Sequence, residues 1–106
     1  MNQQGLSKEK KLLLVEDDSL MLEVLKELLS DSGVSVDTSV NGAEGYQKFS
    51  ENNYDLIISD IQMPVLNGVE FLKKVRSKDS QSPKFMLLTG YSTYKNEEVF
   101  KLGANS

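Results

Sequence analysis

The stretch Leu56-Ile57-Ile58-Ser59-Asp60 is a continuous apolar run that ends in a single carboxylate. It is followed by Ile61-Gln62-Met63-Pro64 and then by Asn67-Gly68, where a helical pattern begins. An uninterrupted apolar run of this length is typical of a strand that is buried on both faces of a parallel sheet. The segment therefore predicts a buried strand, a proline-containing loop and the start of a helix.

A second apolar run, Leu12-Leu13-Leu14-Val15, ends in the acidic sequence Glu16-Asp17-Asp18. The carboxyl ends of parallel strands meet at one edge of a sheet, which is where ligands bind in open α/β folds. Carboxylates gathered there repel one another unless a cation joins them, and Mg²⁺ prefers oxygen ligands. The two runs therefore predict a Mg²⁺ site centred on Asp60. The plainer alternative for residues 16–18 is a solvated acidic turn that caps a helix.

The rest of the chain alternates between strand and helix patterns. Residues 34–40 alternate between apolar and polar side chains, as in an edge strand, and residues 85–88 form another buried run. Helical patterns follow Asp18, Asn41 and Asn67, which are residue types that cap helix starts. The order predicts a parallel sheet with helices on both faces. Core positions predicted on the helices are Met21, Leu25, Leu28, Phe71 and Leu72, and a fourth helix is predicted around Val99, Phe100 and Leu102.

Composition restricts the classes of function. The chain has 106 residues, enough for one compact domain, and a net charge of −4 that argues against a nucleic-acid surface. It contains neither cysteine nor histidine, so thiolate and imidazole chemistry are excluded for the chain itself. No stretch approaches the ~18 apolar residues of a membrane span. Residues 1–10 form a polar tail without a signal-peptide core, which predicts a cytoplasmic location.

From Lys11 to Ser106 the chain resembles the receiver domain of bacterial two-component response regulators. The resemblance is carried by Leu-Leu-Leu-Val-Glu-Asp-Asp at 12–18, Asp60 with Met63-Pro64 and Gly68, Leu88-Thr89-Gly90 and Leu102-Gly103-Ala104. It implies a flavodoxin-like doubly wound parallel sheet. The chain stops before the family's fifth strand and helix, so residues 11–106 are expected to be a receiver domain truncated at its C-terminal end. The family's phosphate-contacting lysine, normally at the end of the fifth strand, would lie beyond Ser106.

The resemblance also implies roles for individual residues. Asp60 corresponds to the phosphoacceptor, and Thr89 to the switch hydroxyl that hydrogen-bonds the new phosphate. Asp17 corresponds to a direct Mg²⁺ ligand, with Glu16 beside it acting partly through water. The backbone carbonyl of Gln62 would be a further metal ligand.

The implied function is a phosphorylation-dependent signalling switch that needs Mg²⁺. Its donor would be a sensor histidine kinase or a phosphotransfer protein, since the chain has no histidine of its own. The chain would not be an enzyme in the usual sense, but a phosphoacceptor that promotes its own phosphorylation and dephosphorylation. Its output would pass to an effector domain or an unknown partner, without nucleic-acid or membrane contact by this domain. The alternatives are a receiver-like interaction module that does not use phosphate and, more weakly supported, a Mg²⁺-dependent phosphatase with an aspartyl-phosphate intermediate.

Overall fold

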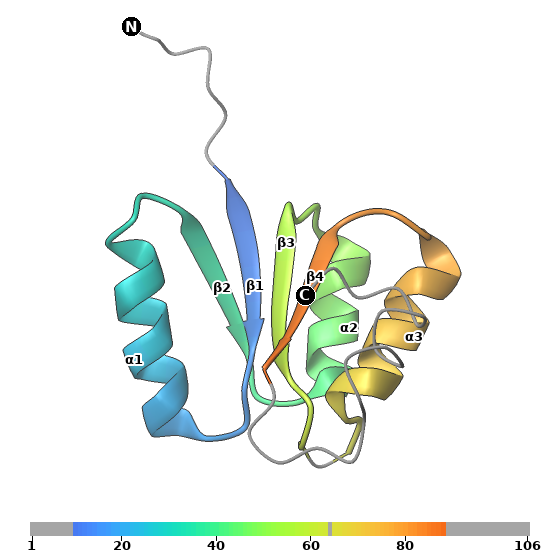
Figure 1. The fold of residues 1–106 in the computed structure, drawn as a ribbon, viewed down its shortest axis with the longest axis horizontal. Helices are drawn as coiled ribbons and strands as arrows, with labels where there is room; N and C mark the ends of the chain where they lie inside the picture. Colours follow the sequence, from blue (N-terminus) through green and yellow to red (C-terminus); the bar gives the residue numbers. More distant parts are fainter. Residues whose placement is uncertain (1–9, 64, 89–106) are drawn as a thin grey trace, which may run out of the picture.

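The computed structural model describes residues 10–63 and 65–88, which form a four-stranded parallel sheet with helices on both faces (Figure 1). Strands and helices alternate along the whole described chain, as the sequence predicts. The elements are β1 (Lys11–Val15), α1 (Ser19–Ser30), β2 (Ser35–Ser39), α2 (Gly42–Glu51), β3 (Leu56–Asp60), α3 (Gly68–Lys78) and β4 (Lys84–Leu88).

The strands lie in the order β2-β1-β3-β4, and every neighbouring pair is parallel. The chain passes from β1 outward to β2 and then returns across β1 to β3. Because such crossovers are right-handed, this reversal places α1 on one face of the sheet and α2 on the other. The predicted doubly wound sheet is confirmed, and the two apolar runs that end in acids occupy neighbouring central strands. The strand predicted at residues 34–40 is an edge strand.

Alternate residues of β1, β3 and β4 enter two separate cores. The larger core lies under α2 and α3 and contains Phe71 and Leu72, both predicted as core residues and both fully buried. Its ring–ring contact joins Phe71 and Phe85, whose centroids are 5.3 Å apart. The smaller core lies under α1, and its buried members among the described residues are Leu12, Leu14, Leu22 and Ile58.

The helices begin at the capping residues that the sequence indicates. The Asp18 carboxylate accepts hydrogen bonds from the backbone N–H groups of Leu20 and Met21. Asn41 and Asn67 each accept a hydrogen bond from the backbone N–H three residues ahead. These side chains satisfy donors that the first helical turn would otherwise leave unpaired.

The predicted core positions on α1 are partly wrong. Met21 is 46% exposed and Leu28 is 64% exposed, whereas Leu25 is half-buried as part of the smaller core. Among the described residues, α1 packs over β1 and β2 through Leu22, Leu25 and Leu29. The apolar arc of the helix is therefore wider than the surface it covers, and its far side is left in solvent.

Several predictions fall outside the part of the chain that the structure describes. These are the polar tail up to residue 9, the loop residue Pro64, the switch residue Thr89 and the helix predicted around residues 99–102. Within residues 10–63 and 65–88, no helix is long and apolar enough to cross a membrane.

Candidate functional site

Three carboxylates meet at the edge of the sheet where the strands end. Glu16 and Asp17 follow β1 directly, and Asp60 is the last residue of β3. Because β1 and β3 pair in parallel, with Val15 opposite Ser59, the ends of the two strands lie side by side. One carboxylate oxygen from each acid lies within 4.8 Å of the others. The structure thus brings together three of the residues predicted to bind metal.

The three acids differ in their exposure to solvent. Glu16 is buried, Asp60 is half-buried and Asp17 is exposed. The pKa of Glu16 is raised to about 7, mainly by burial and also by the neighbouring charges of Asp60 and Asp17. A backbone hydrogen bond of 3.1 Å from Asp18 N–H to Glu16 Oε2 lowers this pKa and offsets part of the rise. At neutral pH the cluster therefore holds a proton in equilibrium on its most buried member.

The loop between β3 and α3 carries Gln62 and is closed by backbone contacts. The N–H of Gly68 donates a hydrogen bond of 2.9 Å to the carbonyl of Ile61. A Cβ on Gly68 would approach the carbonyl oxygen of Asp60 more closely than the 3.0 Å that real Cβ atoms keep. A glycine is required here because the start of α3 passes directly against the backbone of the proposed phosphoacceptor. Gln62 itself is exposed, two residues after Asp60.

The last described residue before Thr89 also lies at this edge. Leu88 ends β4 and pairs with Asp60 across the β3–β4 ladder. Its carbonyl accepts a hydrogen bond of 3.3 Å from the backbone N–H of Ile61. The end of β4 is therefore fixed beside the end of β3, while Thr89 itself lies beyond the described region.

The donor set of this cluster suits a hard divalent cation. Carboxylate and carbonyl oxygens are the ligands that Mg²⁺ and Ca²⁺ take in proteins, and the 106 residues contain no histidine or cysteine that could add a nitrogen or sulfur ligand. A bound cation would also relieve the mutual repulsion of the three acids. Glu16, Asp17 and Asp60 are therefore the residues of the described chain that could hold a metal ion.

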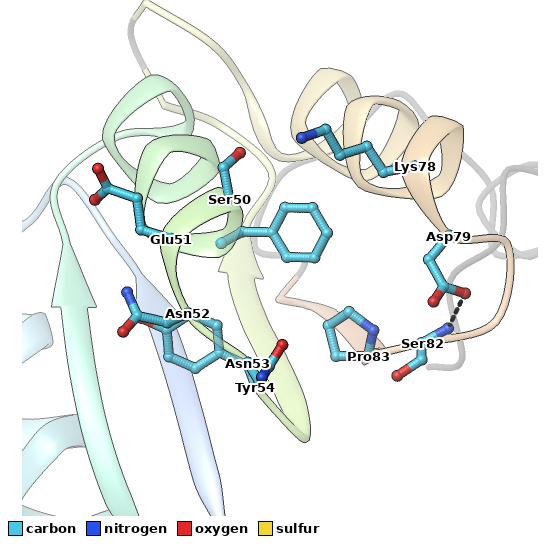
Figure 2. Close-up of a pocket in the computed structure, with 10 residues that line it drawn as sticks. Ser50, Glu51, Asn52, Asn53, Tyr54, Lys78, Asp79, Ser82 and Pro83 are labelled. Atoms are coloured by element: carbon cyan, nitrogen blue, oxygen red, sulfur yellow. Dashed lines mark hydrogen bonds between the residues drawn. The ribbon is translucent and has the colours of Figure 1, made fainter.

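A separate cavity of about 310 Å³ lies at the opposite edge of the sheet, between the last turns of α2 and α3 (Figure 2). Phe49, Lys78 and Pro83 line it, whereas the Glu51 side chain points away from it. The Asp79 carboxylate at its rim accepts backbone hydrogen bonds from its own loop, at residues 81 and 82. This cavity lies where the strands begin, so it is not part of the acidic site.

Comparisons with known proteins agree with this geometry. The family model described as "Response regulator receiver domain" matches residues 12–106. The transcriptional regulatory protein CpxR homolog of Haemophilus influenzae is 48% identical over 77 residues, which is 73% of this chain and 33% of that protein. The transcriptional regulatory protein DltR of Streptococcus agalactiae is 35% identical over 95 residues, 90% of this chain and 42% of that protein. The chain thus spans less than half the length of these relatives.

Solved structures share the whole described fold. The chemotaxis protein CheY4 of Vibrio cholerae superposes with a TM-score of 0.83 at 33% identity, covering 92% of this chain and 82% of that chain. The response regulator TrrA of Thermotoga maritima, solved in complex with Mg²⁺ and BeF, gives a TM-score of 0.82 at 40% identity, covering 91% and 82%. With the matched family, the fold and the edge of clustered acids in agreement, the chain belongs to the response regulator receiver domains.

Proposed function

We propose that this chain is a phosphorylation-dependent signalling switch in which Asp60 accepts a phosphoryl group. The observation that carries the proposal is the meeting of Glu16, Asp17 and Asp60 at the ends of two neighbouring strands, with oxygens within 4.8 Å of one another. A carboxylate is a competent nucleophile for an aspartyl phosphate. Its half-buried position at the open edge of the sheet leaves it accessible to a donor.

We propose that Glu16, Asp17, Asp60 and the backbone carbonyl of Gln62 hold Mg²⁺ at this edge. The structure of TrrA, which is 40% identical to this chain and was solved in complex with Mg²⁺ and BeF, supports this assignment. When bound, the cation supplies Lewis-acid stabilisation of the charge on the phosphoryl oxygens. The protein's own part is to hold its acids at fixed positions, so that the attacking oxygen of Asp60 is aligned with phosphorus.

In the proposed reaction, an oxygen of the Asp60 carboxylate forms a bond to phosphorus, and the phosphorus–nitrogen bond of a phosphohistidine breaks. The leaving imidazole takes up a proton from solvent, and Asp60 becomes an acyl phosphate. The phosphohistidine cannot come from these 106 residues, which contain no histidine. A sensor histidine kinase or a phosphotransfer protein fits this requirement. Thr89, next after Leu88 in the sequence, is proposed to donate its hydroxyl to the new phosphate.

The output of the switch is proposed to pass to another protein region. The relatives CpxR homolog and DltR are named transcriptional regulatory proteins, and this chain matches less than half of each. We therefore propose that residues 11–106 form the receiver part and that an effector region or a protein partner reads its phosphorylation state. Such a switch would work in the cytoplasm, as a phosphoacceptor that promotes its own phosphorylation and dephosphorylation.

The test is the intact mass of the protein after incubation with Mg²⁺ and acetyl phosphate. The expected result is one added phosphoryl group that is absent with EDTA and absent in Asp60→Asn. Circular dichroism of both proteins establishes that they are folded. A folded wild-type protein that gains no phosphoryl group would contradict the switch and favour a binding module that does not use phosphate. Steady release of phosphate from small phosphomonoesters would favour the phosphatase alternative.

A further inference from the structure

A backbone contact joins the start of α2 to the loop between β3 and α3. The N–H of Gly42 donates a hydrogen bond of 3.1 Å to the carbonyl of Leu66. Gly42 is buried, and a Cβ placed on it would come closer than 3.0 Å to that carbonyl oxygen and 3.1 Å from the Leu66 Cβ. The obstacle is mainly main chain, which cannot rotate away as a side chain can. The loop and the helix therefore stay at this separation only while residue 42 is a glycine.

The loop that Gly42 holds is short and strained. Its ends are closed by the hydrogen bond from Gly68 N–H to the Ile61 carbonyl, and the Met63 side chain is buried in the larger core. Val65 has a φ of 71°, in the left-handed region that a β-branched residue rarely adopts. Such a conformation persists only where the surrounding structure enforces it. The hydrogen bond at Leu66 holds the backbone at the residue directly after Val65.

The same loop begins directly after Asp60 and carries Gln62, so its path affects where the Gln62 backbone lies relative to Asp60. We infer that Gly42 is a positioning residue for the metal site, acting through Leu66 on the loop although it supplies no ligand itself. This inference rests on the Mg²⁺ site proposed above. If Gly42 has this role, metal affinity depends on the first turn of α2. This helix follows β2, whereas the acids lie at the ends of β1 and β3.

The chemistry of Mg²⁺ makes the affinity sensitive to such a displacement. Mg²⁺ requires nearly ideal octahedral geometry with short ligand distances, so small shifts of a ligand are costly. Groups that only orient the ligands commonly change metal affinity ~10-fold or more when they are altered. Gly42→Ala should push the Leu66 backbone outward and weaken Mg²⁺ binding by about tenfold.

The chain offers a matched control in Gly45, one turn further along α2. Gly45 is also buried, but a Cβ there would meet side-chain atoms of Val15 at 3.0 Å and Phe71 at 3.2 Å, not the loop. Gly45→Ala should therefore lower the melting temperature while leaving the Mg²⁺ dissociation constant within about twofold of the wild-type value. Isothermal titration with MgCl₂ at pH 8, above the pKa of Glu16, measures the Mg²⁺ dissociation constants of the two variants and of the wild type.

Equal losses of affinity in the two variants, or no loss in Gly42→Ala, would overturn the positioning role. A wild-type chain that binds no Mg²⁺ would instead remove the metal site on which the inference rests. A second measurement needs no variant, in case Gly42→Ala does not fold. Saturating Mg²⁺ should slow amide hydrogen exchange at the N–H of Gly42 more than at that of Gly45, whose hydrogen bond of 3.0 Å goes to Asn41. Equal slowing at both amides would also overturn the role.

Discussion

The phenolic hydroxyl of Tyr54 donates a hydrogen bond of 2.8 Å to Oδ2 of Asp37, which joins the segment before β3 to the edge strand β2. The Lys11 ammonium lies 3.7 Å from the same carboxylate oxygen and 5.4 Å from the centre of the Tyr54 ring. Burial of Tyr54, together with its bond to Asp37, holds the pKa of the phenol above its usual range. These three side chains tie β1, β2 and the start of β3 together.

Tyr54→Phe should lower the free energy of unfolding by about 1 kcal/mol, because it removes the donor and leaves the half-buried Asp37 with less compensation. Urea unfolding followed by circular dichroism measures this change. Tyr46→Phe is the matched control, since the Tyr46 ring contacts Phe49 and Lys74 and would be retained. The control should change stability by less than about 0.5 kcal/mol. Equal effects of the two substitutions would contradict a specific role for the Tyr54–Asp37 bond.

The raised pKa of Glu16 predicts how the stability of the metal-free protein changes with pH. The folded protein holds this proton up to about pH 7, whereas the ordinary pKa of the group is 4.5. Between these values the folded state binds more protons than the unfolded state, so acidification stabilises it. The contribution of Glu16 is complete below about pH 4.5 and is lost as pH rises through 7. Glu16→Gln should remove this part of the pH dependence. The measurement is the free energy of unfolding in urea from pH 5 to 8, compared between the wild-type protein and the variant. If the stabilities of the wild-type protein and Glu16→Gln changed with pH in parallel, the raised pKa of Glu16 would be contradicted.

Mg²⁺ affinity should show the opposite pH dependence. A metal ion competes with the proton for Glu16, because a ligating carboxylate must be ionised. The dissociation constant for Mg²⁺ should therefore rise about tenfold per pH unit as pH falls below 7, if one proton is displaced. Titration calorimetry at pH 6, 7 and 8 in buffers of different ionisation enthalpy also counts the protons released. No proton release at pH 6 would show that Glu16 stays outside the metal's ligand set.

Two buried serines lie near the ends of β2 and β3, the strands on either side of β1, and their replacement by alanine should change stability in opposite directions. The Ser39 hydroxyl is buried and, among the described residues, has no hydrogen-bond partner, whereas the Ser59 hydroxyl donates a bond of 2.9 Å to the Asp60 carbonyl. Ser39→Ala removes an unsatisfied polar group and should stabilise the fold by about 1 kcal/mol. Ser59→Ala removes a bond that is made and should destabilise it by a similar amount, about 1 kcal/mol. Thermal unfolding of the two variants, at one pH and without metal, decides whether the signs differ.

Val65 offers a test of backbone strain beside the acidic site. Its side chain is 80% exposed, so it gains little from packing, while its left-handed backbone is costly for valine. Val65→Asn should raise the free energy of unfolding by about 1 kcal/mol, since asparagine tolerates this conformation. Val40→Asn is the control, because Val40 is also exposed but has no positive φ. A gain in the control as large as that in Val65→Asn would show that the gain comes from replacing an exposed apolar side chain and not from relieving backbone strain.

The elements that the sequence predicts well are those governed by local rules. The apolar runs of β1 and β3, the acids that end them and the caps at Asp18 and Asn67 follow from residue type and spacing alone. Parallel pairing then places the acids at one edge without further information. Each of these inferences needs only the chain's immediate neighbourhood and one rule of topology.

The misassigned and missed features depend on contacts between distant segments. Leu28 has the spacing of a core residue and yet is exposed, because helical spacing does not reveal how much of the sheet a helix covers. No sequence pattern indicates a positive φ at Val65, since valine is among the residues least suited to it. In the sequence, only the Asn41-Gly42 pair before a helix hints weakly that Gly42 makes a close contact. Its partner Leu66 lies 24 residues further along the chain and is identified only by the fold.

The two cores differ in size, so the two layers of the described fold should differ in their stability against local unfolding. Helix α1 has one buried side chain, Leu22, while α3 contributes Val69, Phe71, Leu72 and Val75 to the larger core. Local opening follows the number of buried apolar contacts that must be broken. A protease should therefore find its first cleavage sites in α1 and the turn after it, while the sheet remains folded against α2 and α3. Glu16 and Asp17 lie between β1 and the start of α1. A metal ion bound by them and by Asp60 would therefore stabilise the less stable layer against local opening where α1 begins.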